Sequence, residues 1–121
     1  MDLKIKSSTS TAVKICGITK VDQAMEIASL GANAIGVIGV KSSKRYLKKN
    51  LREGLFNEIK KNAPDVERVW VIANMSDTQI DEGILCNGSP STIQLHGDES
   101  KERCHFLKNK YPNINIWKAI R

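Results

Sequence analysis

The sequence predicts an α/β fold of parallel βα repeats, with about five strands and four helices. Short apolar runs rich in Ile and Val alternate with amphipathic stretches, which is typical of successive βα units. The chain has 121 residues, of which 40% are hydrophobic and 5% aromatic, and this suffices for one compact domain with an aliphatic core. We expect that domain over residues 13–121 and a flexible arm over residues 1–12.

Five apolar runs are the predicted strands, and each is bounded by turn residues. They cover residues 13–16, 34–40, 68–74, 92–96 and 114–120. Runs of this kind are typical of strands that are buried on both faces of a parallel sheet. The fifth run would leave Ile116, Trp117 and Ile120 on an unpaired edge, which favours association with a partner.

The first two predicted helices follow the first two strands. Thr19 and Asp22 have the spacing of a capping box, and Gly31 provides a left-handed stop. Between them an apolar stripe is formed by Val21, Ala24, Met25 and Ala28. The second helix has its stripe at Leu51, Leu55, Phe56 and Ile59 and should end before Pro64, because the residue that precedes proline is disfavoured in a helix.

The third and fourth predicted helices are shorter. Ser76 or Asp77 caps the third, whose apolar face is Ile80, Ile84 and Leu85, and residues 87–90 break it. The fourth extends from about Ser100 to Tyr111 and ends at Pro112. Its inward residues are Cys104, Leu107 and Tyr111.

The charge does not identify a partner. The formal net charge is +6, and the densest basic group consists of Lys41, Lys44, Arg45, Lys48, Lys49 and Arg52. The other basic residues lie beside acidic ones on predicted helix surfaces. A solvated helical face is therefore favoured over a nucleic-acid site, and attraction of a small anionic substrate is compatible with the charge.

The cysteine pattern and the lack of long apolar runs indicate a protein of the cytoplasm. Cys16, Cys86 and Cys104 are odd in number and include no C-x-x-C pair, so neither a disulfide framework nor a zinc site is predicted. Residues 1–12 lack the apolar core of a secretory signal. No run approaches the roughly 18 apolar residues of a membrane span, so we expect no membrane partner.

The first and fourth strands carry candidate site residues. Strand alternation places Lys14 and Cys16 on one face, with Cys16 at the carboxyl end, where βα barrels have their active sites. A neighbouring ammonium would favour the thiolate, although a buried structural cysteine is the alternative. Thr92, Gln94 and His96 should also share one face and point into the barrel mouth, where a polar ligand or solvent would satisfy them.

Two further candidates follow the second and third strands. Arg45 and Asn74 come where the βα loops gather, and an arginine there could hold a carboxylate through two hydrogen bonds. The alternative for Arg45 is a solvated member of the basic group. We interpret Cys86, Cys104 and His105 as packing or surface residues, because none of them lies at a strand end.

Five segments, taken together, resemble the phosphoribosylanthranilate isomerase family in its own order over residues 13–121. They are Lys14 to Thr19, Gly31 to Gly36, Ser43 to Tyr46, Gln94 to Glu99, and Lys118 to Arg121. The resemblance implies the first half of a TIM (β/α)8 barrel. It also implies an Amadori rearrangement of N-(5-phosphoribosyl)anthranilate in tryptophan biosynthesis, with no metal or organic cofactor.

The resemblance also implies roles for individual residues. Cys16 matches the family's general base, which removes the C2 proton, and Arg45 matches the arginine that contacts the anthranilate moiety. Lys14, Asn74, Gln94 and His96 are expected to bind the substrate. The family's general acid, an aspartate after the sixth strand, and its phosphate loops match nothing in these 121 residues. We therefore expect the chain alone to be inactive, and the alternative is a non-catalytic half-barrel that pairs with itself or with a completing half.

Overall fold

The computed structural model describes residues 12–120, so most of the expected arm at residues 1–12 lies outside the described part. The strands are β1 (Lys14–Cys16), β2 (Ala34–Ile38), β3 (Glu67–Ile72), β4 (Thr92–Leu95) and β5 (Asn115–Lys118). The helices are α1 (Val21–Ser29), α2 (Lys49–Asn62), α3 (Asp77–Ile84) and α4 (Lys101–Lys110). The predicted alternation of strands and helices is confirmed, and only the ends of the elements shift.

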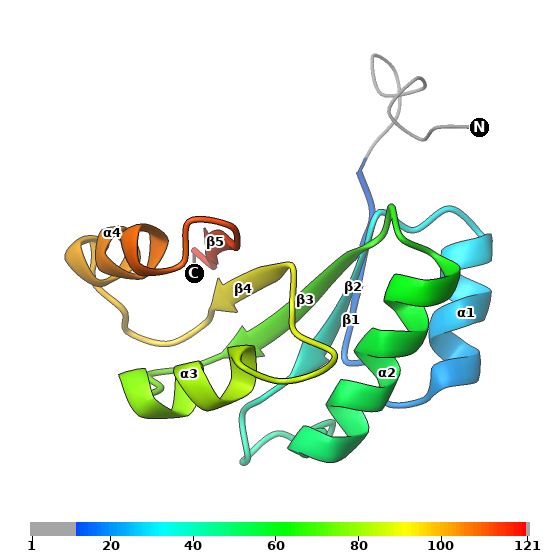
Figure 1. Cartoon of the computed structure of the whole chain (residues 1–121), viewed down its shortest axis with the longest axis horizontal. Coiled ribbons are helices and arrows are strands. Elements are labelled where there is room, and N and C mark those ends of the chain that lie inside the picture. Colours follow the sequence, from blue (N-terminus) through cyan, green and yellow to red (C-terminus); the bar gives the residue numbers. More distant parts are fainter. Residues whose placement is uncertain (1–11, 121) are drawn as a thin grey trace.

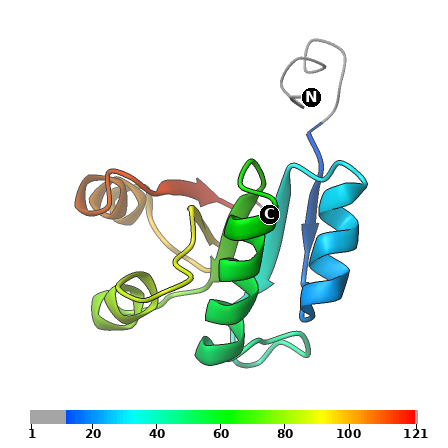
Figure 2. The same ribbon diagram turned by 45° about the vertical axis from the view of Figure 1, so that its right-hand side comes forward.

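All five strands are parallel and lie in one sheet in the order β1-β2-β3-β4-β5. The sheet curves, with the helices along its outer side (Figure 1, Figure 2). Within residues 12–120, β1 and β5 are therefore the two edges. The predicted unpaired edge at β5 is confirmed, and there Trp117 is 38% and Ile120 87% exposed.

The two faces of the sheet differ in what covers them. On the outer side, Ile35, Val37, Ile72, Ile93 and Leu95 pack under the helices in one core cluster. On the inner side a smaller cluster contains Ala34, Val69 and Val71, with Cys16 and Ile38 packed against it. The period-two alternation of a strand sends neighbouring residues to opposite faces, which produces this division.

Helix α1 ends as predicted but begins differently. Gly31, at φ +100°, donates its N–H to the Ala28 carbonyl, and Ala32 donates to the Ile27 carbonyl. These two bonds form a Schellman motif. The predicted capping box is wrong, because the N-cap is Lys20, which makes no side-chain cap, and Thr19 lies one residue too early to reach the free amides. The predicted inward Val21 is 39% exposed at the helix start.

The stripe of α2 is only partly as predicted. Leu55, Phe56 and Ile59 are buried, but Leu51 is 51% exposed and Arg52 is buried instead. The helix ends at Asn62, before Pro64 as expected. Arg52 was expected on a solvated face, and its burial is possible because Trp70 and Phe56 provide aromatic faces for the guanidinium.

The last two helices begin where the sequence predicts, and of the two cap candidates for α3, Ser76 and Asp77, Ser76 is the N-cap. Ser76 caps α3 in a capping box with Gln79, whereas the predicted inward Leu85 lies beyond the last turn and is 80% exposed. Ser100 caps α4 through the Arg103 amide, and Leu107 is buried. Cys104 and Tyr111 pack against the outer core cluster as expected. Among residues 12–120, no helix has the length and apolar character needed to cross a bilayer.

Candidate functional site

Lys14 and Cys16 lie together on the inner face of β1. The register pairs Cys16 with Gly36 of β2. A Cβ atom at Gly36 would lie 3.0 Å from Cys16 Sγ and 3.1 Å from Lys14 Cε. Glycine at position 36 thus leaves the space in which both side chains lie, and Cys16 is half-buried there.

Lys14 reaches across the sheet to Gln94 on β4. Its Nζ donates a hydrogen bond to Gln94 Oε1. Strands lie about 4.8 Å apart, so in a flat sheet the three strand steps from β1 to β4 would separate the backbones by about 14 Å. A lysine cannot span that distance, so the curvature of the sheet brings these two residues together.

The register agrees with the stagger of an eight-stranded barrel. Lys14 pairs with Ala34 and Ala34 with Glu67, whereas Gln94 pairs with Val71, four residues beyond Glu67. Four residues over three strand steps is about one residue per strand, the value for a barrel of eight strands and shear 8. The paired residues can be followed from Cys16 in the same way, and after three strand steps they lead to Thr92 on β4. His96 lies four residues after Thr92.

His96 is exposed, directly after β4, and its backbone N–H donates to the Ile72 carbonyl at 2.8 Å. This stagger brings His96, like Cys16, to the carboxyl ends of the strands. The expectation that Thr92 also points into the mouth is wrong. Thr92 lies at the amino end of β4, and the four-residue offset between it and His96 corresponds to about 13 Å along the strand. Thr92 is fully buried.

Thr92 belongs to a polar layer at the amino ends of the strands. Its hydroxyl donates to the Glu67 carboxylate at 2.6 Å, and the same Oε1 accepts from Ser91 at 3.0 Å and from Asn115 at 3.4 Å. Burial favours a higher pKa for Glu67, but these hydrogen bonds outweigh it and hold the pKa below its ordinary value. In barrels of this kind, the amino ends of the strands contribute stability rather than chemistry.

Arg45 lies beside the end of β1. A Cβ at Gly17, which follows Cys16, would lie 2.7 Å from the Arg45 guanidinium carbon. Gly17 has φ +85°, a backbone conformation that favours glycine, whereas the exposed Arg45 side chain could move away from an added Cβ. The loop that carries Arg45 is tied to β2, because the Leu47 N–H donates to the Ile38 carbonyl at 3.0 Å. Arg45 itself is exposed.

Asn74 joins two loops at the carboxyl ends of the strands. It has φ +51°, and its Oδ1 accepts from the Asp98 N–H at 2.9 Å. A Cβ at Gly97 would lie 2.7 Å from that oxygen. The contacts of the Asn74 side chain therefore hold the loop after β4 against the loop after β3.

Glu99 is a site residue that the sequence reasoning missed. Its side chain is 4% exposed, and its carboxylate accepts from the Asn74 N–H at 2.7 Å, the Gly97 N–H at 2.9 Å and Lys118 Nζ at 3.0 Å. Burial favours a higher pKa, but the hydrogen bonds from Asn74, Gly97 and Lys118 hold the pKa of Glu99 below its ordinary value. Helix position alone gives no signal for this role, because Glu99 precedes the N-cap of α4.

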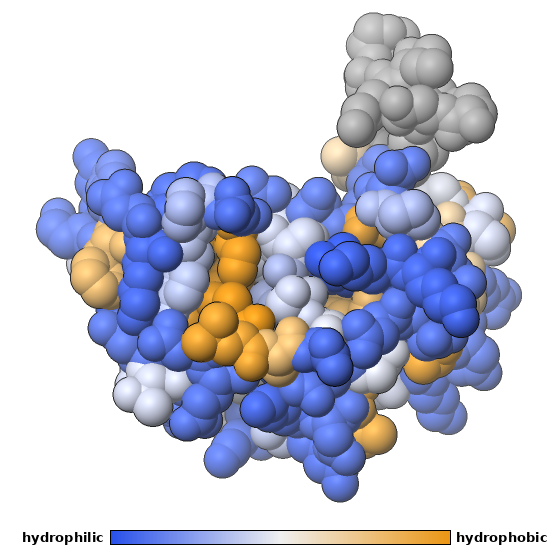
Figure 3. Space-filling model, viewed as in Figure 1, coloured by the Kyte–Doolittle hydropathy of each residue, from blue (hydrophilic) through white to orange (hydrophobic). Residues whose placement is uncertain are grey.

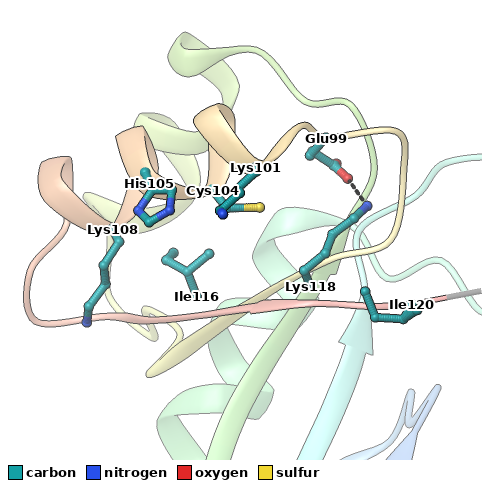
Figure 4. A pocket seen from close by; sticks show the side chains of 8 residues that line it. All are labelled: Glu99, Lys101, Cys104, His105, Lys108, Ile116, Lys118 and Ile120. Carbon is teal, nitrogen blue, oxygen red and sulfur yellow. Dashed lines mark hydrogen bonds and ion pairs between the residues drawn. The ribbon is translucent and has the colours of Figure 1, made fainter.

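A cavity of about 470 Å³ lies on the outer side, away from Lys14 and Cys16. It opens between α4, which contributes Cys104 and His105, and β5, which contributes Ile116 and Lys118 (Figure 4). The Glu99 to Lys118 ion pair closes one end. No group of three or more potential metal ligands occurs among residues 12–120.

Comparisons with known proteins agree on one family. The family model for N-(5'-phosphoribosyl)anthranilate isomerase matches residues 13–121. The isomerase of Trichodesmium erythraeum is 43% identical over 110 residues, which make up 90% of this chain and 46% of the relative. The isomerase of Crocosphaera subtropica is 40% identical over 109 residues, 90% of this chain and 50% of the relative. The chain spans about half the length of the curated relatives it matches.

Solved structures give the same result. The phosphoribosyl anthranilate isomerase of Thermotoga maritima superposes with a TM-score of 0.80 at 30% identity, over 92% of this chain and 51% of that chain. A structure of this enzyme type in complex with reduced 1-(o-carboxyphenylamino)-1-deoxyribulose 5-phosphate also has a TM-score of 0.80 at 30% identity, and 92% of this chain covers 54% of it. The five strands and four helices of this chain therefore form the fold of half such a barrel.

Proposed function

We propose that this chain, which belongs to the N-(5'-phosphoribosyl)anthranilate isomerase family, provides the part of an isomerase active site that contains the general base. The proposed reaction is the Amadori rearrangement of the aminoaldose N-(5-phosphoribosyl)anthranilate to the corresponding aminoketose in tryptophan biosynthesis. The observation that carries the proposal is the placement of Cys16, Lys14 and Gln94 on the inner face of one curved sheet.

Cys16 is the proposed general base. After the ribose ring has opened to a protonated Schiff base, the thiolate takes the proton from C2. The electron pair of that C–H bond forms the C1–C2 double bond, and the C1–N double-bond pair moves to the nitrogen, which gives a neutral enolamine. Ketonisation then gives the product, with no net gain or loss of atoms. A thiol fits this role because its pKa is closer to neutral pH than that of a hydroxyl group.

The neighbours of Cys16 have proposed binding roles. Arg45, beside Gly17, would hold the anthranilate carboxylate through paired hydrogen bonds. Lys14 and Gln94 would exchange their mutual hydrogen bond for contacts with the substrate hydroxyls. His96 and Asn74 would form the rim on the β3 and β4 side.

A general acid and a phosphate site would have to come from further βα units, because the family's residues for these roles match nothing in the 121 residues. We expect the 121-residue chain by itself to show no turnover. A positioned acid typically contributes about 10²- to 10⁴-fold, and a phosphate anchor orients the reacting carbons.

A chimera tests the proposal. Residues 1–121 would be joined to the part of the Trichodesmium erythraeum isomerase that this chain does not cover, and loss of substrate fluorescence would be followed. The chimera should turn over, and Cys16→Ser should lower kcat by about 10²- to 10⁴-fold. Cys104→Ser, which changes a thiol on the outer side, is the matched control and should leave kcat unchanged.

Two results would contradict the proposal. One is a folded chimera in which Cys16→Ser retains the full rate. The other is a 121-residue chain that turns over substrate by itself and loses that activity in Cys16→Ser, which would mean that the missing acid is not needed.

A further inference from the structure

Arg52 of α2 is a buried cation on the outer side of the sheet. It is 2% exposed, and its guanidinium carbon lies 4.5 Å from the Trp70 ring centroid and 6.0 Å from that of Phe56. The aromatic faces partly replace hydration of the cation. They do not neutralise it.

Arg52 has electrostatic partners but no ion pair. The Cys86 side chain hydrogen-bonds to it and Glu53 interacts with its charge. Among residues 12–120, however, no carboxylate lies within ion-pair distance of its guanidinium, and the buried Nη1 has no hydrogen-bond acceptor. The nearby Cys86 thiol does not compensate, because burial, assisted by Glu53, raises its pKa and keeps it protonated at neutral pH. A buried cation that lacks an ion pair and keeps an unsatisfied N–H group is costly, so Nη1 of Arg52 indicates a place for a further acceptor such as an anion.

Arg52 lines a pocket of about 140 Å³ that has further positive features. Lys41 and Lys49 line it as well, and Glu82 is the acid among its lining residues. The pocket lies at the start of α2, where Lys48 provides no side-chain cap and the first turn contains no acidic residue. Free N–H groups at a helix start favour anions.

We propose that this pocket, called here the Arg52 pocket, binds one phosphate-like oxyanion, either inorganic phosphate or the phosphoryl group of a small ester. The pocket volume of about 140 Å³ is sufficient for one such anion. The anion would accept a hydrogen bond from the unsatisfied Nη1 of Arg52 and would form the ion pair that Arg52 lacks. The Arg52 pocket lies on the helix side of β3, whereas Cys16 lies on the inner face, so this site is separate from the proposed isomerase site.

Titration of the 121-residue chain with inorganic phosphate tests the site, by calorimetry and by thermal unfolding. Phosphate should bind saturably and raise Tm, and sodium chloride at matched ionic strength should not. Glycerol phosphate is the second probe. Binding of the ester as well as of inorganic phosphate supports an open site for phosphoryl groups, and binding of inorganic phosphate alone supports a site for the free ion.

Exposed lysines provide variants that should fold normally. Lys49→Ala and Lys41→Ala should each weaken phosphate binding about two- to fivefold, and Glu82→Gln should tighten it by a similar factor. Lys60→Ala, on the last turn of the same helix, is the matched control with the same loss of charge and should bind phosphate as the parent does. Arg52→Met should abolish binding if the variant folds.

Three outcomes would overturn the proposal. One is a response to phosphate that chloride reproduces, as expected of a pocket filled only by water. The second is binding that Lys49→Ala and Lys41→Ala leave unchanged. The third is binding that is lost in Lys14→Met instead, which would place the phosphate on the inner face of the sheet.

Discussion

At the scale of single residues, glycines leave the space in which the proposed site residues lie. Gly36 leaves room for Lys14 and Cys16, and Gly17 lets the Arg45 guanidinium approach the backbone next to Cys16. A side chain at either glycine would displace a proposed site residue. The charged residues with many hydrogen bonds, Glu67 and Glu99, instead hold strands and loops together.

Glu99→Gln should lower the free energy of unfolding by about 1–3 kcal/mol at neutral pH, because charge-assisted hydrogen bonds from Asn74, Gly97 and Lys118 are weakened. The folded pKa of Glu99 lies below its ordinary value of 4.5. Its contribution is therefore present above about pH 4.5 and is lost as the pH falls through the folded pKa. Urea unfolding of parent and variant at several pH values measures this.

Glu26→Gln on the exposed side of α1 is the control and should change stability little. If the difference in free energy of unfolding between the parent and Glu99→Gln stayed constant down to the lowest pH, the carboxylate charge would not contribute to stability.

At the scale of elements, the helices are positioned by their buried residues and their ends. Ser76 and Ser100 supply caps that local sequence specifies, and Gly31 ends α1. Local sequence does not predict which residues of α2 face the core. Arg52 is buried instead of Leu51, because the Trp70 ring lies beneath α2 and packs against the guanidinium. Trp70 also explains why α3 has a buried glycine at position 83.

Two glycines inside helices should respond oppositely to alanine. Gly54 of α2 is exposed, and its added Cβ meets nothing within 4 Å, so Gly54→Ala should stabilise by about 0.5–1 kcal/mol. A Cβ at Gly83 of α3 would lie 2.1 Å from Trp70 Cη2, so Gly83→Ala should destabilise by about 1–3 kcal/mol. The midpoints of urea unfolding provide the comparison.

Equal effects of the two substitutions would contradict the close packing of Trp70 against α3. In a Trp70→Leu background, the added Cβ of Gly83→Ala no longer clashes with the indole ring. The loss of stability caused by the alanine should therefore be much smaller there than in the parent.

At the scale of the whole molecule, the sheet is curved but open among residues 12–120. A strip of hydrophobic residues reaches the surface between the region of β4 and the end of α3, surrounded by hydrophilic residues (Figure 1, Figure 3). Ile120 is 87% exposed and Trp117 38% exposed on the unpaired edge. Exposed strand edges with apolar side chains favour pairing with another chain.

The 121-residue chain should therefore associate in a concentration-dependent manner, which sedimentation velocity measures. Trp117→Lys combined with Ile120→Lys should shift it toward monomer. Leu85→Lys, at an equally exposed leucine after α3, is the control and should not. A parent chain that stays monomeric at all concentrations would contradict this prediction.

Local patterns in the sequence specify the order of the nine elements, the end of α1 at Gly31 and the start of α4 near Ser100. They also specify the alternation that places Lys14 and Cys16 on one face, and they narrow the cap of α3 to Ser76 or Asp77. These follow from period, turn residues and caps, which act over a few residues. The folded chain adds four features: the Lys14 to Gln94 hydrogen bond, the Thr92 to Glu67 hydrogen bond, the contacts of Glu99 with three segments, and the burial of Arg52. Those contacts depend on sheet curvature, register and neighbouring side chains that are far apart in sequence, so no local pattern specifies them.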